Sequence, residues 1–253
     1  YEFRNKGLDL FLESLKLLAA SGTLERDVLV YITVPAANSG PRKDLQAHLA
    51  DPAQPVDPAQ YRFSTHCLER QAEDPIVRSI EGSILAADDS RVKVIFVPTY
   101  LNRADGIFGK DYYELLVGMD VTVFASYYEP WGYTPLESAA FSVPTVTTTL
   151  AGFGLWVDKL PEHEGAVVIR RDDYNDHEAE QGVADALARF ARLDGERLAQ
   201  VRRSACEISR TALWERLFSY YERAYAAAVE NSVSRTNSVV LDDGGTRDQP
   251  INF

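Results

Sequence analysis

The sequence predicts an α/β fold built on a doubly wound parallel sheet, with additional helices at its carboxyl end. Short apolar runs typical of buried strands alternate with segments whose apolar residues recur every three or four positions, as in helices. This alternation indicates βαβ units and therefore parallel strands. Hydrophobic residues make up 45% of the 253 residues, so the chain can bury a substantial core.

The predicted strands are runs of β-branched and apolar residues that end at turn residues. They cover residues 27–34, 92–97, 121–125, 144–149 and 166–169. The predicted helices follow the three-to-four spacing of apolar residues. They cover residues 6–18, 111–118, 178–193, 195–209 and 212–229, and residues 136–141 form the start of another.

The domain organisation predicted from the sequence is one domain over residues 1–230, whose part from 176 is helical. Residues 38–90 are polar, contain several prolines and suggest an insertion or interaction segment with short helices near 43–50 and 75–86. Residues 231–253 are polar and are expected to form a flexible tail. Because the first five residues look like the end of a strand-to-helix turn, we expect further residues of this fold to precede Tyr1.

Composition excludes several classes of protein. The net charge of -12 argues against non-specific nucleic-acid binding, and no apolar run reaches the length of a membrane span. Two cysteines are too few for a disulfide framework, and the four histidines have no metal-ligand spacing. We therefore expect a soluble, cytoplasmic protein that uses no metal or other cofactor and binds neither nucleic acid nor membrane.

The most informative stretch is residues 126–135, Ser-Tyr-Tyr-Glu-Pro-Trp-Gly-Tyr-Thr-Pro, here called the aromatic turn. It lies between a predicted strand and a predicted helix, where open α/β sheets bind ligands. Glu129 in the turn and Glu137 beyond it could face one cleft and accept hydrogen bonds from hydroxyl groups. Alternatively, they are a surface acid and an acid favoured by the helix dipole.

Other candidate residues have two interpretations each. The backbone N–H groups of Gly132, Tyr133 and Thr134 could bind a phosphate at the start of a helix, and Thr134 could equally be an ordinary N-cap. Gly152 and Gly154 suit a tight turn or a close approach of two backbones.

Three blocks of the sequence carry a family resemblance. Residues 1–7 (Tyr-Glu-Phe-Arg-Asn-Lys-Gly), the aromatic turn and residues 151–154 (Ala-Gly-Phe-Gly) occur in this order. Together they resemble the carboxyl-terminal domain of glycogen synthases of the animal and fungal type, and the similarity extends over roughly residues 1–230. The resemblance implies the carboxyl-terminal half of a GT-B fold and a retaining transferase that extends an α-1,4-glucan from UDP-glucose.

The resemblance also implies roles for individual residues. Glu129 would contact the donor glucose and Lys6 the diphosphate, and these two are the predicted catalytic residues. The predicted donor-binding residues are Glu137 at the ribose, Gly132, Tyr133 and Thr134 near the phosphate, Tyr112 and Tyr100 around the uracil, and Gly152 and Gly154 beside the sugar. Without the resemblance, the sequence favours simpler interpretations. Lys6 would be a solvated charge, and one of the adjacent Tyr112 and Tyr113 would be a core residue.

The resemblance also implies a partner domain, and two alternative functions stay open. A GT-B enzyme closes two domains over its donor, so we expect this chain to need an amino-terminal domain and to be inactive alone; homo-oligomerisation stays open. The alternatives are another retaining nucleotide-sugar transferase and a non-catalytic nucleotide-sugar or glucan-binding module.

The family senses glucose 6-phosphate through a dense arginine cluster. Here Arg197, Arg202, Arg203 and Arg210 are predicted to form a solvated helix face, without a strong response to that ligand.

Overall fold

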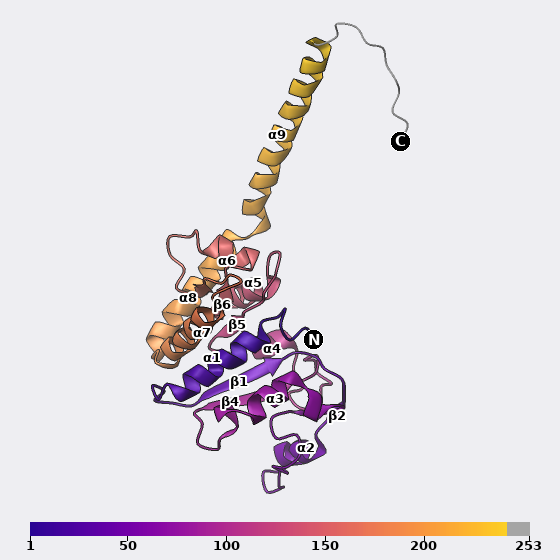
Figure 1. The fold of residues 1–253 in the computed structure, drawn as a ribbon, viewed down its shortest axis with the longest axis vertical. Helices are drawn as coiled ribbons and strands as arrows, with labels where there is room; N and C mark the ends of the chain where they lie inside the picture. The colour runs from indigo at the N-terminus through magenta and orange to yellow at the C-terminus, as the bar shows by residue number, and fades with distance from the viewer. Residues whose placement is uncertain (242–253) are drawn as a thin grey trace. The chain divides into compact units, whose positions relative to one another are not determined.

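The computed structural model describes the backbone of residues 1–241 and the side chains of residues 1–235 (Figure 1). The chain divides into two compact units, Tyr1–Ser209 and a second that begins at Arg210. The first unit therefore ends earlier than the predicted boundary at residue 230. The second contains one long helix, α9 (Trp214–Leu241), so residues 231–241 are helical rather than a flexible tail. The rest of the predicted tail lies outside the described residues.

Parallel strands form the centre of the first unit, as predicted. Strand β1 (Val28–Thr33) pairs with β4 (Val92–Val97), and β6 (Thr145–Thr148) pairs with β5 (Thr122–Phe124) on one side and β7 (Ala166–Ile169) on the other. All of these pairings are parallel. The strands are rich in valine, isoleucine and threonine, whose branched side chains suit a pleated surface. The predicted α/β class is confirmed.

Helices cover both faces of the strands, as expected for a doubly wound fold. Along β7, Ala166 and Val168 belong to one hydrophobic cluster, whereas Val167 and Ile169 pack against the other, because successive side chains of a strand point to opposite faces. The larger cluster contains residues of α1 (Leu8–Ala20), α3 (Pro75–Glu81) and α7 (Asp176–Ala191). The smaller contains residues of α5 (Tyr133–Ala140), α6 (Gly152–Val157) and α8 (Gly195–Thr211).

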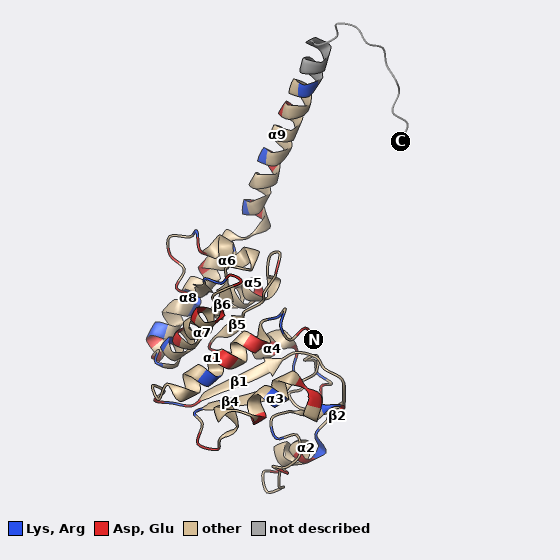
Figure 2. Cartoon of the chain, in the orientation of Figure 1, with Lys and Arg blue, Asp and Glu red and all other residues tan. Residues whose placement is uncertain are grey.

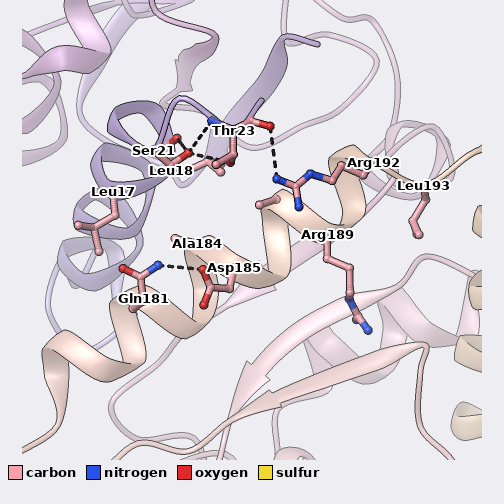
Figure 3. Close-up of a pocket in the computed structure, with 11 residues that line it drawn as sticks. Leu17, Leu18, Ser21, Thr23, Gln181, Ala184, Asp185, Arg189, Arg192 and Leu193 are labelled. Atoms are coloured by element: carbon pink, nitrogen blue, oxygen red, sulfur yellow. Dashed lines mark hydrogen bonds between the residues drawn. The ribbon is translucent and has the colours of Figure 1, made fainter. Parts of the chain in front are cut away.

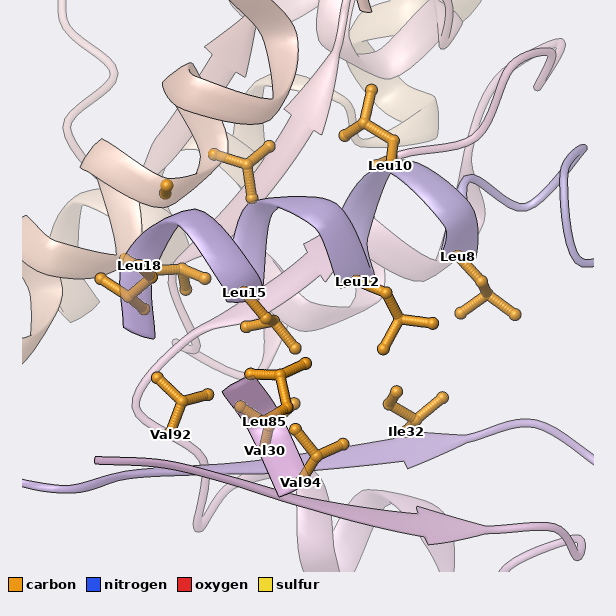
Figure 4. Packing of buried hydrophobic residues seen from close by; sticks show 14 of the residues in the cluster. Leu8, Leu10, Leu12, Leu15, Leu18, Val30, Ile32, Leu85, Val92 and Val94 are labelled. Atoms are coloured by element: carbon orange, nitrogen blue, oxygen red, sulfur yellow. The ribbon is translucent and has the colours of Figure 1, made fainter. Parts of the chain in front are cut away.

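Helix α1 is the centre of the larger core. Figure 4 shows Leu8, Leu12 and Leu15 packed above the aliphatic side chains of β1 and β4, with both strands running toward the end of α1 that carries Leu8. Leu12 and Leu15 are completely buried. Full burial of such a side chain contributes roughly 2 kcal/mol from the hydrophobic effect alone. The spacing of these leucines by three and four residues is what places them on one face.

The segment over residues 38–90 is only partly an insertion. A short antiparallel pair, β2 (Asn38–Pro41) and β3 (His66–Leu68), carries α2 (Lys43–Ala50), none of whose residues is buried. Helix α3, by contrast, buries Ile76, Val77 and Ile80 in the main core. The short 3₁₀ turns Gln71–Glu73 and Ile84–Ala86 flank it. Both predicted helical stretches are present, and the second packs into the main core instead of standing apart as an insertion.

Of the four arginines predicted to form a solvated face on α8, Arg203 and Arg210 are exposed, whereas Arg202 is not. Its guanidinium donates to the carbonyl oxygen of Met119 at 2.5 Å and its side chain is 25% exposed. Met119 precedes β5, so this contact anchors α8 at the amino-terminal end of the strands. Ala205 and Ile208 on the same helix are buried against the sheet.

Helix α9 of the second unit carries a row of aromatic side chains. In α9, ring contacts link Trp214, Phe218, Tyr221 and Tyr225, which recur every three or four residues. Figure 2 shows its Lys, Arg, Asp and Glu residues interspersed along the described length. Within the described residues, no helix combines the length and the apolar character that crossing a membrane requires.

Candidate functional site

The aromatic turn runs beside the glycine-containing segment that begins α6. The N–H of Glu129 donates to the carbonyl of Leu150 at 3.3 Å, and the N–H of Gly152 donates back to the carbonyl of Glu129 at 3.2 Å. Phe153 donates to the carbonyl of Trp131 at 2.6 Å. Two blocks that the sequence singled out separately are therefore paired at the carboxyl ends of β5 and β6.

Gly152 and Gly154 permit this pairing because they lack a side chain. Both lie in the first turn of α6, so of the two predicted explanations the tight turn is wrong and the close approach is right. A Cβ on Gly152 would lie 2.3 Å from the carbonyl oxygen of Pro130, and one on Gly154 would lie 2.1 Å from that of Thr148. Neither backbone could be this close with any other residue.

The amino-terminal block, residues 1–7, also lies at the carboxyl end of β5. Gly7 has a positive φ of 69°, and a Cβ there would lie 1.7 Å from the carbonyl oxygen of Ala125, the residue that follows β5. Tyr127 donates its N–H to the carbonyl of Asn5 at 2.8 Å. Residues 1–7 are therefore held directly against the start of the aromatic turn.

Lys6 and Glu129, the predicted catalytic residues, meet at this edge. The Nζ atom of Lys6 lies 3.2 Å from Oε2 of Glu129, and their side chains are 48% and 29% exposed. An ion pair with this much solvent contact contributes little to stability. It leaves an ammonium group and a carboxylate accessible to a ligand, which suits contacts to phosphate and hydroxyl groups respectively.

Gly132 is the N-cap of α5, with a positive φ of 97°. The helix begins at Tyr133, so Thr134 is a residue of the first turn and the interpretation of Thr134 as the N-cap is wrong. The N–H groups of this turn point out of the helix end, where an anion is stabilised by their dipoles. Tyr133 is 71% exposed, which leaves the helix start open to solvent.

Glu137 lies on α5 and faces the tyrosines of α4 (Tyr112–Leu116). Its carboxylate is the main reason that the pKa of Tyr113 is raised. Burial raises the pKa of Tyr112, and Glu137 adds to the effect. The ring of Tyr113 stacks on Phe141 with centroids 4.8 Å apart. The structure thus brings Tyr112 and Glu137, two of the predicted donor-binding residues, into one neighbourhood.

Tyr112 and Tyr100 occupy different environments. Tyr112 is half-buried and lines a cavity of about 180 Å³ between β1 and β5. Tyr100 follows β4 and is 74% exposed. In the part of the chain that the structure describes, no hydrogen bond or ring contact joins its side chain to the other predicted residues.

Arg171 and Tyr127 were not predicted as site residues. The guanidinium of Arg171 lies 3.5 Å from the centroid of the Tyr127 ring and donates to the carbonyl of Ala125 at 2.6 Å. One signal could have indicated Arg171: it follows the predicted strand at 166–169 within the pair Arg170-Arg171. Charged residues directly after a buried strand lie where ligands bind in such folds.

A separate cavity of about 610 Å³ lies between the end of α1 and α7 (Figure 3). Arg192 donates to the carbonyl of Thr23 at 3.4 Å across it, and Gln181 donates to Asp185 along α7. None of the predicted site residues lines this cavity. Among the described residues, no group of three His, Cys, Asp or Glu side chains is placed to hold a metal ion.

Comparison with known proteins gives a consistent assignment. The family model for glycogen synthase matches residues 58–247. The glycogen [starch] synthase of Caenorhabditis elegans is 28% identical over 97% of this chain and 45% of its own length. Isoform 1 of Saccharomyces cerevisiae is 38% identical over 63% of this chain and 23% of its own. This chain therefore spans less than half the length of these relatives.

Solved glycosyltransferase structures share a more distant likeness. The catalytic domain of starch synthase IV from Arabidopsis thaliana, solved with ADP and acarbose, is 18% identical, with a TM-score of 0.39 over 90% of this chain and 44% of that one. The family model covers most of the chain, including the aromatic turn and the glycine-containing segment beside it. By this match, the chain belongs to the glycogen synthase family.

Proposed function

We propose that the unit Tyr1–Ser209 is the UDP-glucose-binding half of a retaining glucosyltransferase that extends an α-1,4-glucan in the cytoplasm. The observation that carries the proposal is the Lys6–Glu129 pair, 3.2 Å apart and solvent-accessible at the carboxyl ends of the strands. Around it lie the first turn of α5 and the start of α6. This arrangement places a cation, helix N–H groups and a carboxylate on one edge, which are the groups that a sugar diphosphate requires.

In this proposal, each part of the donor meets a different element. The diphosphate binds Lys6 and the N–H groups of Tyr133 and Thr134, and the glucose lies between Glu129 and the start of α6. Glu137 accepts hydrogen bonds from the ribose, and Tyr112 and Tyr100 approach the uracil. The carboxylate of Glu129 also stabilises positive charge that develops at the anomeric carbon.

The reaction proceeds with retention at that carbon. The bond from C1 of glucose to the phosphate oxygen breaks, and the bond from C1 to the 4-hydroxyl oxygen of the acceptor forms on the same face. The departing phosphate oxygen takes the acceptor proton. Positioning and charge stabilisation therefore supply the catalysis. Because the family relatives are more than twice as long as this chain, the acceptor and the second face of the donor belong to an amino-terminal half, and we expect the isolated chain to bind UDP without turnover.

Calorimetric titration of the chain with UDP tests the proposal. We expect binding that weakens at least tenfold in Lys6→Met and in Glu137→Gln, because each variant removes one contact to the charged or ribosyl part of the ligand. The matched control is Lys16→Met, which removes a lysine that pairs with Glu13 on α1 instead. Since the Lys6–Glu129 pair is solvent-accessible, the melting temperature of Lys6→Met should stay within a few degrees of the parent.

The titration also separates the alternatives. Absence of UDP binding to the parent chain would refute the proposal. Binding of a glucan without UDP would instead support a non-catalytic glucan-binding module. A preference for a different nucleoside diphosphate would support another retaining transferase.

A further inference from the structure

Arg171 is the most deeply buried charged group next to the site. It follows β7, its side chain is fully buried, and it ends 3.3 Å from Asp176 at the start of α7. Removing a guanidinium from water is costly unless its donors are satisfied, so each of its contacts matters. Its Nε atom has no hydrogen-bond partner within the described residues, which adds to that cost.

The contacts of Arg171 converge on the aromatic turn. One terminal nitrogen donates to the carbonyl of Ala125 at 2.6 Å, and the face of the guanidinium lies on the ring of Tyr127. The backbone of Arg171 is held as well: its N–H donates to Oγ1 of Thr149, and that hydroxyl donates to its carbonyl. Arg171 thus joins the ends of β5, β6 and β7 at the point where the aromatic turn begins.

Tyr127 links Arg171 to both predicted catalytic residues. Its hydroxyl donates to Asp176 at 3.2 Å, and its N–H donates to Asn5, the neighbour of Lys6. Glu129 lies two residues after Tyr127 in the same turn. The hydrogen bonds and ion pairs of the Arg171 side chain among the described residues go to Ala125 and Asp176, so it acts on the pair indirectly.

We propose that Arg171 is a positioning residue, which holds Tyr127 and thereby sets Glu129 opposite Lys6. A stacked, planar guanidinium with two directed donors can fix a turn in this way, whereas a lysine cannot. Amide hydrogen exchange by itself tests whether Arg171 holds the turn in place. The consequence for UDP rests on the proposed function.

Amide hydrogen exchange in the full chain provides the first test. In Arg171→Lys we expect the N–H groups of Tyr127, Glu129 and Gly152, which bond to Asn5, Leu150 and Glu129, to exchange at least tenfold faster. Core amides such as those of Val94 and Val146 should keep their rates. Equal acceleration everywhere would show a merely structural role and would overturn the proposal, as would unchanged exchange in the turn.

Tyr127→Leu provides a second variant, since it removes the stacked ring and its hydroxyl while Arg171 keeps its own partners, Ala125 and Asp176. It should reproduce the local acceleration at Glu129, and combining it with Arg171→Lys should add little, because both changes break the same link. Full protection of Glu129 in Tyr127→Leu would overturn the proposal even if Arg171→Lys does not fold.

Arg202→Lys is the matched control, because Arg202 also donates to backbone carbonyls but at the opposite ends of the strands. In calorimetric titrations with UDP, we expect Arg171→Lys to weaken binding about tenfold, and Arg202→Lys less than twofold. Equal weakening in the two variants would contradict positioning. If the parent chain does not bind UDP, the proposed function fails, and the exchange rates still decide the role of Arg171.

Discussion

Gly152 donates its N–H to the carbonyl oxygen of Glu129 at 3.2 Å, and it lies so close to the aromatic turn that a Cβ would sit 2.3 Å from the carbonyl oxygen of Pro130. The two segments meet through their backbones, and neither can yield as a flexible side chain would. This contact holds the backbone of Glu129 beside the start of α6.

Gly152→Ala should therefore displace the aromatic turn. We expect a loss of roughly 2 kcal/mol in the free energy of unfolding, typical of overpacking against a backbone, together with the loss of UDP binding. Chemical denaturation and calorimetry measure the two effects. Gly195→Ala is the control, because nothing lies within 4 Å of a Cβ at that position. Equal stability of the two variants would show that the turn can shift without cost.

Two threonines of β6 should be replaceable with a gain in stability. The hydroxyls of Thr145 and Thr147 are buried and have no hydrogen-bond partner within the described residues. Thr145→Val and Thr147→Val remove an unsatisfied polar group at nearly constant shape, so each should raise the free energy of unfolding by about 1 kcal/mol. Thermal denaturation measures the change.

Thr148→Val is the matched control on the same strand. Its hydroxyl donates to Ser126 at 3.5 Å and accepts from the N–H of Leu150 at 3.2 Å, next to the aromatic turn. Losing these contacts should lower stability by about 1 kcal/mol. If all three variants changed stability in the same direction, hydrogen bonding would not be the cause.

The Arg42–Asp44 pair should make stability depend on acidic pH. The Arg42 guanidinium, which is 5% exposed, lowers the pKa of Asp44 from 3.8 to about 2. A lowered carboxyl pKa contributes stability that is complete above its ordinary value and is lost as pH falls through the lowered one. We expect Asp44→Asn to be less stable than the parent by about 1 kcal/mol at pH 7, a value reduced by partial solvation.

Denaturation between pH 7 and pH 2 measures this dependence. The difference between Asp44→Asn and the parent should shrink from about pH 4 downward. Asp88→Asn is the comparison at pH 7: Asp88 pairs with Arg62 but is 96% exposed, so little change is expected. A difference for Asp44→Asn that persisted undiminished at pH 2 would contradict this origin.

Strand β1 should exchange its amide hydrogens alternately. The N–H of Val28 donates to the carbonyl of Arg91, beside β4. In the parallel ladder, the N–H groups of Val30 and Ile32 therefore also point toward β4. The N–H groups of Leu29 and Tyr31 point the other way, toward the cavity between β1 and β5. No strand among the described residues pairs with that edge. The amides of Leu29 and Tyr31 should exchange at least tenfold faster than those of Val30 and Ile32 in an NMR exchange series. Uniform protection would mean that the edge is covered.

Much of the fold followed from local patterns. The runs of branched residues predicted β1, β4, β5, β6 and β7 to within one or two residues at each end, because strand-forming preference and burial act residue by residue. The three blocks that indicated the family were likewise readable from the chain as residue patterns, although the reason for their glycines was not. Two predictions failed where local composition was misleading. Helix α9 extends beyond residue 229 through polar residues. Helix α3 is buried despite its proline-rich surroundings.

The sequence by itself thus determined the class of fold, the family and the candidate residues at the strand ends. Only the tertiary structure decided how those residues meet. Lys6 and Glu129 are 123 residues apart, and Arg171 reaches Ala125 across 46. Such contacts depend on how strands order and helices pack, and no periodicity along the chain encodes them. The close approach at Gly7 and Gly152 has the same basis, because the atom that excludes a Cβ belongs to a distant segment.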